Sequence, residues 1–303
     1  LESSEYVLIE TLFQRATRMG KTSVMISSKD KLRTLIGDWA THAFSSEQPL
    51  GEVVEAIGEP PQINSLEVNG WIIRAANHIR SSRQVDVMYT ATTDYAMHTY
   101  PPEDPHSQKH MAILDDAIGE LVEAHPDITL MITADHGMNA KCHADGTPRV
   151  IYVEDVLREK FGDGHTVICP ITDPYVVHHG ALGSYVTLHL AETNRAEEIG
   201  EWLRGLDGVT EVLAKAEAAE ALELPADRIG DLIVMSAADT VLGRSPEYHD
   251  LSKLDRPLRS HGGRFETMVP FIFSGPLNAE YTAKATEDPR NFEVFDYICN
   301  GIQ

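Results

Sequence analysis

The sequence predicts an α/β fold, in which a mainly parallel central sheet has helices on both faces and carries a small inserted α+β cap. Three observations lead to this prediction. Over residues 9–133, apolar residues at helical spacing alternate with short apolar strands. After about residue 150 the order of expected helices and strands changes, and another apolar strand follows residue 256. Regular alternation of helices and strands is typical of a parallel sheet that helices cover on both sides.

The first half of the chain consists of helix–strand steps with one long loop between them. Each expected helix has apolar residues three and four positions apart, and each expected strand is a short apolar run. Pro49, Pro60 and Pro61 predict a surface loop. In chain order we expect a helix at 9–18, a strand at 22–27, a loop at 48–63, a helix at 66–79, a strand at 85–90, a helix at 111–122 and a strand at 128–133.

The second half contains a segment that we expect to form the cap. Its elements are a strand at 185–190, a helix around 199–203, a strand at 209–213, a helix at 215–223 and a strand at 231–236. A strand at 268–273 then returns the chain to the central sheet. The predicted domains are therefore an α/β core of residues 1–149 and 256–303 and an inserted cap of residues 150–255.

The composition restricts the kinds of partner. The chain has 47 acidic and 25 basic residues and a formal net charge of −22, so the extended phosphate backbone of a nucleic acid would be repelled. We therefore expect no nucleic acid as a partner. A small anionic substrate remains compatible with this charge where metal ions or a few lysines reverse the field locally.

Cysteine usage and hydropathy predict the compartment. Cys142, Cys169 and Cys299 are widely spaced and form no CxxC pair, which favours a reducing compartment. No apolar run approaches the roughly 18 to 20 residues that cross a bilayer. We expect a soluble cytoplasmic protein without membrane contact, and the sequence leaves open whether it forms a homodimer. The chain begins with Leu1 rather than Met, so we expect the native chain to be longer.

Residues of the metal-ligand type follow two of the predicted strands. In "TTDYAMH", Asp94 and His98 are four positions apart, which lets both face one point in a helical turn. In "TADHGM", Asp135 and His136 follow the strand at 128–133, and His261 stands in "SHGG", where two glycines allow tight turning. Functional groups collect beyond the carboxyl ends of strands in open α/β sheets. We therefore expect these five side chains around divalent metal ions.

Their donor atoms indicate which metal and which chemistry. Carboxylate oxygen and imidazole nitrogen together suit Zn²⁺, with Mn²⁺ or iron as competitors. Two such ions roughly 3.5 to 4 Å apart form a clamp that suits displacement at phosphorus.

The same motifs carry a family resemblance. "TTDYAMH", "TADHGMNAK" and "LRSHGG", in this order and with an insertion before the last, resemble the alkaline phosphatase superfamily and its nucleotide pyrophosphatase/phosphodiesterase-like branch. More narrowly, "KDKLR" at 29–33 and "FSSE" at 44–47 resemble the phosphonoacetate hydrolase family. The resemblance implies an alkaline phosphatase-like core and zinc-dependent hydrolysis of the carbon–phosphorus bond of phosphonoacetate to acetate and phosphate.

The resemblance also implies roles for particular residues. Two Zn²⁺ ions per active site are implied, the first held by Asp94, His98 and His261 and the second partly held by Asp135 and His136. A further aspartate ligand and the threonine nucleophile of the family are not in this sequence. We expect both upstream of Leu1. The sequence therefore leaves open whether residues 1–303 are active by themselves.

Two lysines are candidates for binding the substrate. Lys29 and Lys31 follow the strand at 22–27, so we expect them at the sheet edge that carries the metal ligands. There they would bind the carboxylate of a small anionic phosphonate and reverse the negative field locally. The alternative is that both are solvated lysines at the start of a helix.

Several alternatives stay open. The chain could be a phosphodiesterase or nucleotide pyrophosphatase of the same superfamily, or an inactive metal-binding fragment. We expect His106 and His110 to lie at the surface, and we expect one of His178 and His179 to be exposed and the other packed. Lys141, close in sequence to Asp135 and His136, is a further candidate for a substrate role.

Overall fold

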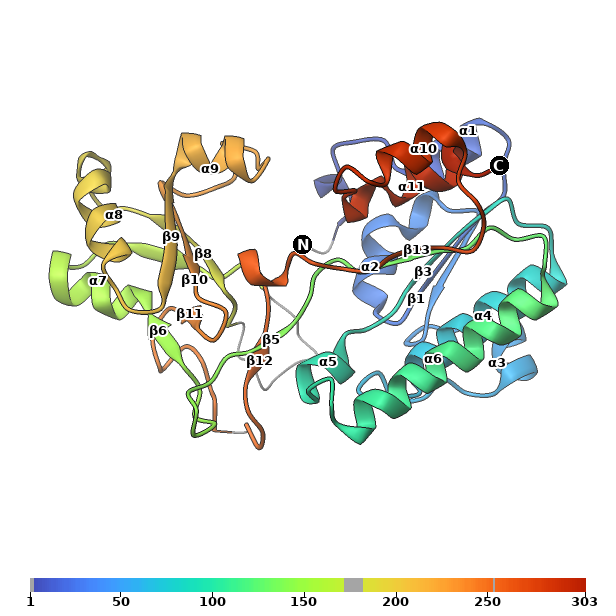
Figure 1. Cartoon of the computed structure of the whole chain (residues 1–303), viewed down its shortest axis with the longest axis horizontal. Coiled ribbons are helices and arrows are strands. Elements are labelled where there is room, and N and C mark those ends of the chain that lie inside the picture. Colours follow the sequence, from blue (N-terminus) through green and yellow to red (C-terminus); the bar gives the residue numbers. More distant parts are fainter. Residues whose placement is uncertain (1–2, 172–181, 253) are drawn as a thin grey trace. The chain divides into compact units, whose positions relative to one another are not determined.

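The computed structural model describes residues 3–171, 182–252 and 254–303 (Figure 1). His178 and His179 lie outside these residues. The chain divides into two compact units, Leu1–Ile128 and Thr129–Gln303. The division into an α/β core and an inserted cap of residues 150–255 stays a prediction.

A parallel sheet of three strands forms the centre of the first unit. Its strand order is β2 (His42–Ser45), β1 (Ser23–Ser27) and β3 (Val87–Ala91), and β1 pairs in parallel with both neighbours. All five residues of β1 are buried. Such a fully buried strand fits a sheet that is covered on both faces, and the structure confirms the predicted parallel sheet.

Helices cover both faces of this sheet (Figure 1). Successive side chains of a strand point to opposite faces, so Val24 and Ile26 pack against α3 (Gly51–Ile57) and α4 (Val68–Ser82). The other face meets α1 (Leu12–Arg18) and α2 (Asp30–Ile36). There the rings of Phe13 and Tyr89 make an edge contact, with centroids 6.4 Å apart.

The expected loop at 48–63 is wrong in part, because it contains α3. The prolines lie outside this helix, and Val53 within it is fully buried against the sheet. A helix of only seven residues that packs on a sheet is stabilised by this burial rather than by helix propensity.

Two further helices complete the first unit. The short α5 (Tyr95–Thr99) follows β3. The long α6 (Pro105–Ala124) begins earlier than the apolar spacing predicts, because Asp104 accepts the N–H of His106 as N-cap and Pro105 stands in the first turn. An apolar cluster of Ile73, Ala117 and Leu121 joins α6 to α4.

An antiparallel sheet of four strands is the largest element of the second unit. Its strand order is β7 (Thr166–Ile168), β8 (Tyr185–His189), β10 (Leu232–Ser236) and β9 (Val209–Ala214). One apolar cluster joins the sheet to α7 (Val153–Phe161) and α8 (Ala196–Arg204), and another joins it to α9 (Lys215–Ala221).

Three short strand pairs connect the remaining parts of the second unit. They are β6 (Val150–Tyr152) with β11 (Val241–Gly243) in parallel, and β5 (Asn139–Ala140) with β12 (Arg259–Ser260) and β4 (Met131–Thr133) with β13 (Phe271–Phe273) in antiparallel orientation. The apolar strand after residue 256 is thus present, but it runs antiparallel to β4. An apolar run indicates a strand without giving its direction or its burial, and Ile272 in β13 is 52% exposed.

Short helical elements complete the described chain. They are α10 (Ala279–Lys284), α11 (Val294–Asp296), the 3₁₀ turns η1 (Ser4–Tyr6), η2 (Gly37–Trp39), η4 (Thr193–Arg195), η5 (Arg264–Glu266) and η6 (Asn291–Glu293), and the π turn η7 (Tyr297–Gly301). Among the helices in the described ranges, none has both the length and the apolar character needed to cross a membrane.

The apolar contact between α4 and the sheet should dominate the stability of the first unit. Ile72 is fully buried in it, so we expect Ile72→Ala to lower the free energy of unfolding by about 2 to 5 kcal/mol. Met111 on α6 is 61% exposed, and Met111→Ala should change it by less than about 0.5 kcal/mol. Urea unfolding of the full chain measures both, and equal effects would contradict the assigned core.

Candidate metal-binding site

Asp94 and His98 lie at the carboxyl edge of the sheet in the first unit. Strand β3 ends at Ala91, and the carbonyl of Asp94 accepts the N–H of His98 at 3.1 Å, which forms the first turn of α5. This turn brings Nε2 of His98 to 3.0 Å from Oδ2 of Asp94. The spacing of four residues therefore places both side chains at one point, as the sequence predicts.

Lys29 reaches the same point from the neighbouring strand. Ser27 at the end of β1 pairs with Ala91 at the end of β3, so both strands end at the same edge. Lys29 follows β1, and its Nζ lies 3.3 Å from Oδ1 of Asp94. Lys31, in the first turn of α2, is partly exposed. A substrate-binding role for either lysine stays a prediction.

These neighbours keep Asp94 ionised. Burial alone raises the pKa of the Asp94 carboxyl group, but the hydrogen bond and charge of His98 and the charge of Lys29 outweigh this effect. The pKa of Asp94 therefore lies well below its usual value. An ionised carboxylate is the form that binds a metal ion.

The segments "KDKLR" and "FSSE" contact each other at this edge. The hydroxyl group of Ser45 donates to Oδ1 of Asp30 at 2.7 Å, and the N–H of Asp30 donates to the carboxylate of Glu47 at 2.7 Å. Both bonds fix the beginning of α2. The second segment thus holds the turn from which Lys29 and Lys31 project.

In the second unit, His136 and His261 lie side by side. Asp135 and His136 follow β4, His261 follows β12, and the two imidazole rings are nearly parallel, with centroids 3.5 Å apart. Nδ1 of His136 lies 2.9 Å from the carbonyl oxygen of Gly137. A carbonyl only accepts, so Nδ1 carries the proton and the lone pair is on Nε2. In this tautomer Nε2 is the ring nitrogen that can bind a metal ion.

Asp135 belongs to a turn whose backbone is held in place while its carboxylate faces solvent. The amide of Asn291 donates to the carbonyl groups of Ala134 and Asp135, both at 3.1 Å. The Asp135 side chain is 87% exposed. The turn therefore presents this carboxylate on the surface of the second unit.

A buried ion pair joins the two histidine-bearing segments. Nζ of Lys141 lies 2.9 Å from Oε1 of Glu266, and both side chains are almost completely buried. Lys141 also donates to the hydroxyl of Ser184 at 2.6 Å and to the carbonyl of Ala238 at 2.8 Å. Burial lowers the pKa of the Lys141 amine, and its bond to Glu266 opposes this shift. All three protons of the ammonium group thus meet acceptors of the protein.

Glu266 extends this ion pair to both histidines. Its backbone carbonyl accepts the N–H of Gly137, next to His136, at 2.6 Å. Its carboxylate accepts the N–H of Gly263, two residues after His261, at 2.9 Å. One residue therefore fixes the backbone beside both imidazoles.

The glycines of "SHGG" are required by the backbone. Gly262 has a φ of +105°, which residues with a side chain rarely adopt. A Cβ atom on Gly263 would lie 2.8 Å from Cβ of Ser184. Ser184 in turn donates its N–H to the carbonyl of His261 at 2.8 Å. Only glycines let the loop of His261 pack this closely against the start of β8.

The residues fit a metal ion by their chemistry. Asp94 and His98 in the first unit, and Asp135, His136 and His261 in the second, offer carboxylate oxygens and imidazole nitrogens, which are ligands of zinc. Their assignment to one centre stays a prediction from the motifs.

Two expectations for other residues change. His110 is 2% exposed and lies between α4 and α6, so the expectation that it lies at the surface is wrong. It lies on the side of α6 that meets α4, where its ring contacts the carbonyl of Leu66 and the side-chain amide of Asn69. His106 lies at the surface as expected, with a side chain that is 56% exposed. The three bonds of buried Lys141 favour a structural role over a substrate role.

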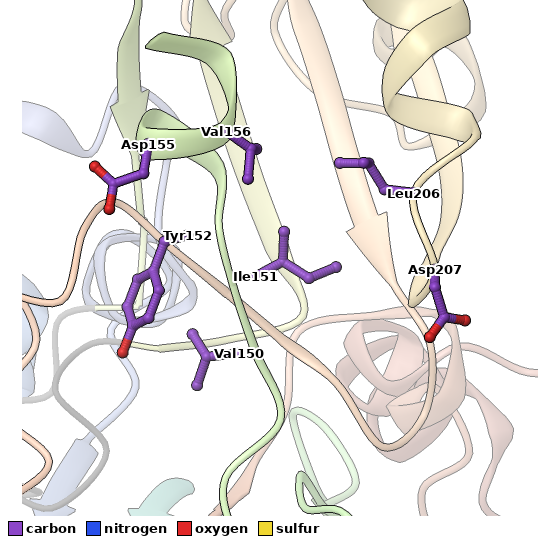
Figure 2. Close-up of a pocket in the computed structure, with 7 residues that line it drawn as sticks. All are labelled: Val150, Ile151, Tyr152, Asp155, Val156, Leu206 and Asp207. Atoms are coloured by element: carbon purple, nitrogen blue, oxygen red, sulfur yellow. The ribbon is translucent and has the colours of Figure 1, made fainter. Parts of the chain in front are cut away.

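An open pocket of about 380 Å³ lies elsewhere in the second unit. Figure 2 shows the carboxylates of Asp155 and Asp207 on opposite sides of its apolar residues, which are Val150, Ile151, Val156 and Leu206, with Tyr152 beside them. Both carboxylates already form ion pairs, with Arg158 and Arg149. None of the predicted ligands lines this pocket.

The buried ion pair gives a prediction about stability. Lys141→Met leaves the Glu266 carboxylate buried without its partner, so we expect it to lower the free energy of unfolding by about 3 to 5 kcal/mol. The double variant Lys141→Met/Glu266→Gln removes both charges and should recover most of this loss. Lys160→Met, at an exposed position of α7, is the control. Urea unfolding measures all three, and a Lys141→Met loss no larger than the control's would refute the assignment.

Comparison with known proteins shows the family to which the chain belongs. A family model described as type I phosphodiesterase/nucleotide pyrophosphatase matches residues 22–264. Crystal structures of phosphonoacetate hydrolase from Sinorhizobium meliloti 1021, in complex with phosphonoformate and with phosphonoacetate, match with a TM-score of 0.87 at 37% sequence identity. Each match covers 98% of this chain and 75% of that chain.

A more distant structure shares the fold. Murine ectonucleotide pyrophosphatase/phosphodiesterase 5 matches with a TM-score of 0.58 at 17% identity, over 88% of this chain and 64% of that chain. The family resemblance and the fold class predicted from the sequence are thus confirmed. The protein belongs to the type I phosphodiesterase/nucleotide pyrophosphatase family and is a metal-dependent hydrolase.

Proposed function

We propose that the protein hydrolyses the carbon–phosphorus bond of phosphonoacetate, giving acetate and phosphate, and that it serves phosphonate degradation in the cytoplasm. The observation that carries this proposal is the similarity to phosphonoacetate hydrolase, at 37% identity over 98% of the chain. The position of Lys29 beside Asp94 supports it, since this edge of the sheet offers a cation to an anionic substrate.

The proposed cofactor is a pair of zinc ions. Asp94, His98 and His261 would hold one ion, and Asp135 and His136 would contribute to the other. The ionised Asp94 and the tautomer of His136 support these roles. When bound, two such ions neutralise the oxygens of a phosphonate and stabilise the charge that develops at phosphorus.

Lys29 and Lys31 would bind the carboxylate of the substrate. When the carbon–phosphorus bond breaks, its electron pair stays on carbon as the enolate of acetate, which then takes up a proton. Cationic side chains near the carboxylate stabilise this leaving group electrostatically. They would also reverse locally the field of a chain with a net charge of −22. The attacking group is the threonine that the family resemblance implies, and a water molecule would then hydrolyse the resulting phosphothreonine to release phosphate.

A phosphodiesterase or nucleotide pyrophosphatase activity is the second candidate. The family model over residues 22–264 favours it, because the proposed metal ligands lie within this range. The substrates of the two candidate activities differ in the group attached to phosphorus. The segment with Lys29 and Lys31 would bind the carboxylate of phosphonoacetate, so it distinguishes the two activities.

A substrate comparison tests the proposal. The product of the complete gene, supplied with zinc, should release phosphate from phosphonoacetate faster than it releases nitrophenol from bis(p-nitrophenyl) phosphate. Lys29→Ala should lower kcat/KM for phosphonoacetate by about 100-fold, the cost of an unpaired charged contact of about 2 to 3 kcal/mol. Lys21→Ala is a matched control, because Lys21 pairs with Asp86 before strand β1 begins. Turnover of the diester without phosphate release from phosphonoacetate would overturn the proposal.

Metal counting tests the proposed cofactor. Dialysed wild-type protein should retain two zinc ions per chain, and His261→Ala should retain fewer, because one ion loses a ligand. His143→Ala, in the nearby turn after β5, should retain the wild-type content. Zinc content by atomic emission, measured against protein concentration, gives the result. An unchanged content in His261→Ala would remove His261 from the proposed ligands.

A further inference from the structure

Three buried polar side chains lie directly behind Asp94 in the first unit. Asn69 on α4, Thr93 before Asp94, and His110 on α6 are 1%, 3% and 2% exposed. Asn69 and His110 do not belong to the motifs that carry the proposed metal ligands, whereas Thr93 directly precedes Asp94 in "TTDYAMH". Polar groups buried to this degree are costly unless they are hydrogen bonded, so their partners indicate what they do.

Asn69 holds the backbone of Thr93 on both sides. Its Oδ1 accepts the N–H of Thr93 at 2.9 Å, and its Nδ2 donates to the carbonyl of Thr93 at 2.7 Å. A primary amide offers both a donor and an acceptor, so it pairs with a residue as a neighbouring strand would. The carbonyl of Thr93 belongs to the peptide group that leads into Asp94. The amide therefore sets the direction in which the chain enters Asp94.

His110 orients this amide. Its Nδ1 lies 3.0 Å from the carbonyl of Leu66, and its Nε2 lies 3.5 Å from Nδ2 of Asn69. The carbonyl only accepts, so Nδ1 carries the proton and Nε2 accepts from the amide. Burial lowers the pKa of His110 below its ordinary value, which keeps the ring neutral. If the amide of Asn69 were turned by 180°, its oxygen would face the lone pair on Nε2 of His110, and the two acceptors would repel each other.

We propose that Asn69 and His110 are positioning residues for the metal site. They fix the backbone at Thr93, and thereby the direction of the Asp94 carboxylate and, through the first turn of α5, that of His98. This inference rests on the proposed function only in taking Asp94 and His98 as metal ligands, and not on the substrate.

The same two helical regions contain a matched pair of residues. Asn77 lies eight positions after Asn69 on α4, and its Oδ1 is 3.0 Å from Nε2 of His125, the residue that follows α6. The hydroxyl of Ser81 is 3.1 Å from the same nitrogen. This second pair of an asparagine and a histidine also joins α4 to the end of α6, but its bonds do not involve Thr93. It serves as a control for the general effect of removing such a contact.

The experiment compares the two pairs in the product of the complete gene. Asn69→Ala and His110→Leu should weaken zinc binding by about 10- to 100-fold, the range for residues that orient metal ligands, whereas Asn77→Ala and His125→Leu should leave it unchanged. Competition with a chromophoric chelator measures the affinity. The absorption spectrum of the cobalt-substituted protein reports the coordination geometry and should change only in the first two variants.

Conservative variants separate positioning from folding. His110→Gln keeps a donor and an acceptor and should restore most of the zinc affinity that His110→Leu loses. Asn69→Asp keeps the acceptor for the N–H of Thr93 but loses the donor for its carbonyl, so it should bind zinc more weakly than the wild type. Should Asn69→Ala not fold, Asn69→Asp decides in its place.

The outcomes of this test are distinct from those for the substrate. Wild-type zinc affinity and cobalt spectrum in folded Asn69→Ala and His110→Leu, even with lowered melting temperatures, would overturn the inference. A wild-type protein that binds no zinc would overturn it as well. Zinc binding that depends on Asn69 in a protein without phosphonoacetate turnover would support the positioning role and refute the proposed substrate.

Discussion

The buried ion pair of Lys141 and Glu266 is the constraint on which the histidine-bearing part of the second unit depends. Removing two charges from water costs several kcal/mol per ion, and an ion pair recovers this cost only where the remaining hydrogen-bonding groups also find partners. Here Ser184 and Asn139 complete the bonding of the pair, at 2.6 Å each. An arrangement that displaced either segment would leave a charge buried alone, so the pair restricts the segments that carry His136 and His261 to one packing.

The two units use the same device to hold candidate ligands. In each of them a buried polar side chain bonds to the backbone beside a ligand, as Asn69 does at Thr93 and Glu266 does at Gly263. Backbone groups have fixed geometry, so such bonds orient a side chain through its own main chain.

The sequence predicts much of the fold and the places of the candidate ligands, because the signals are local. Apolar spacing identifies α4 and β1, and the positions of Asp94 and His136 directly after strands follow from reading a few residues. The supporting contacts were not predictable in this way. Asn69 and His110 are 41 positions apart and Lys141 and Glu266 are 125 apart, so each pair meets only through tertiary packing. The sequence does not indicate helix α3, because the flanking prolines favour a loop and Val53 is the one buried residue within the helix.

The contact between "KDKLR" and "FSSE" has a consequence for how specificity is inherited among relatives. Since Ser45 and Glu47 bond to Asp30 at the beginning of α2, the lysines depend on a second segment for their direction. Exchanging only Lys29 and Lys31 between two related chains would transfer their charges without the contacts of Ser45 and Glu47 that orient them. Natural divergence at this edge of the sheet is therefore expected to change both segments together, as a single unit of inheritance.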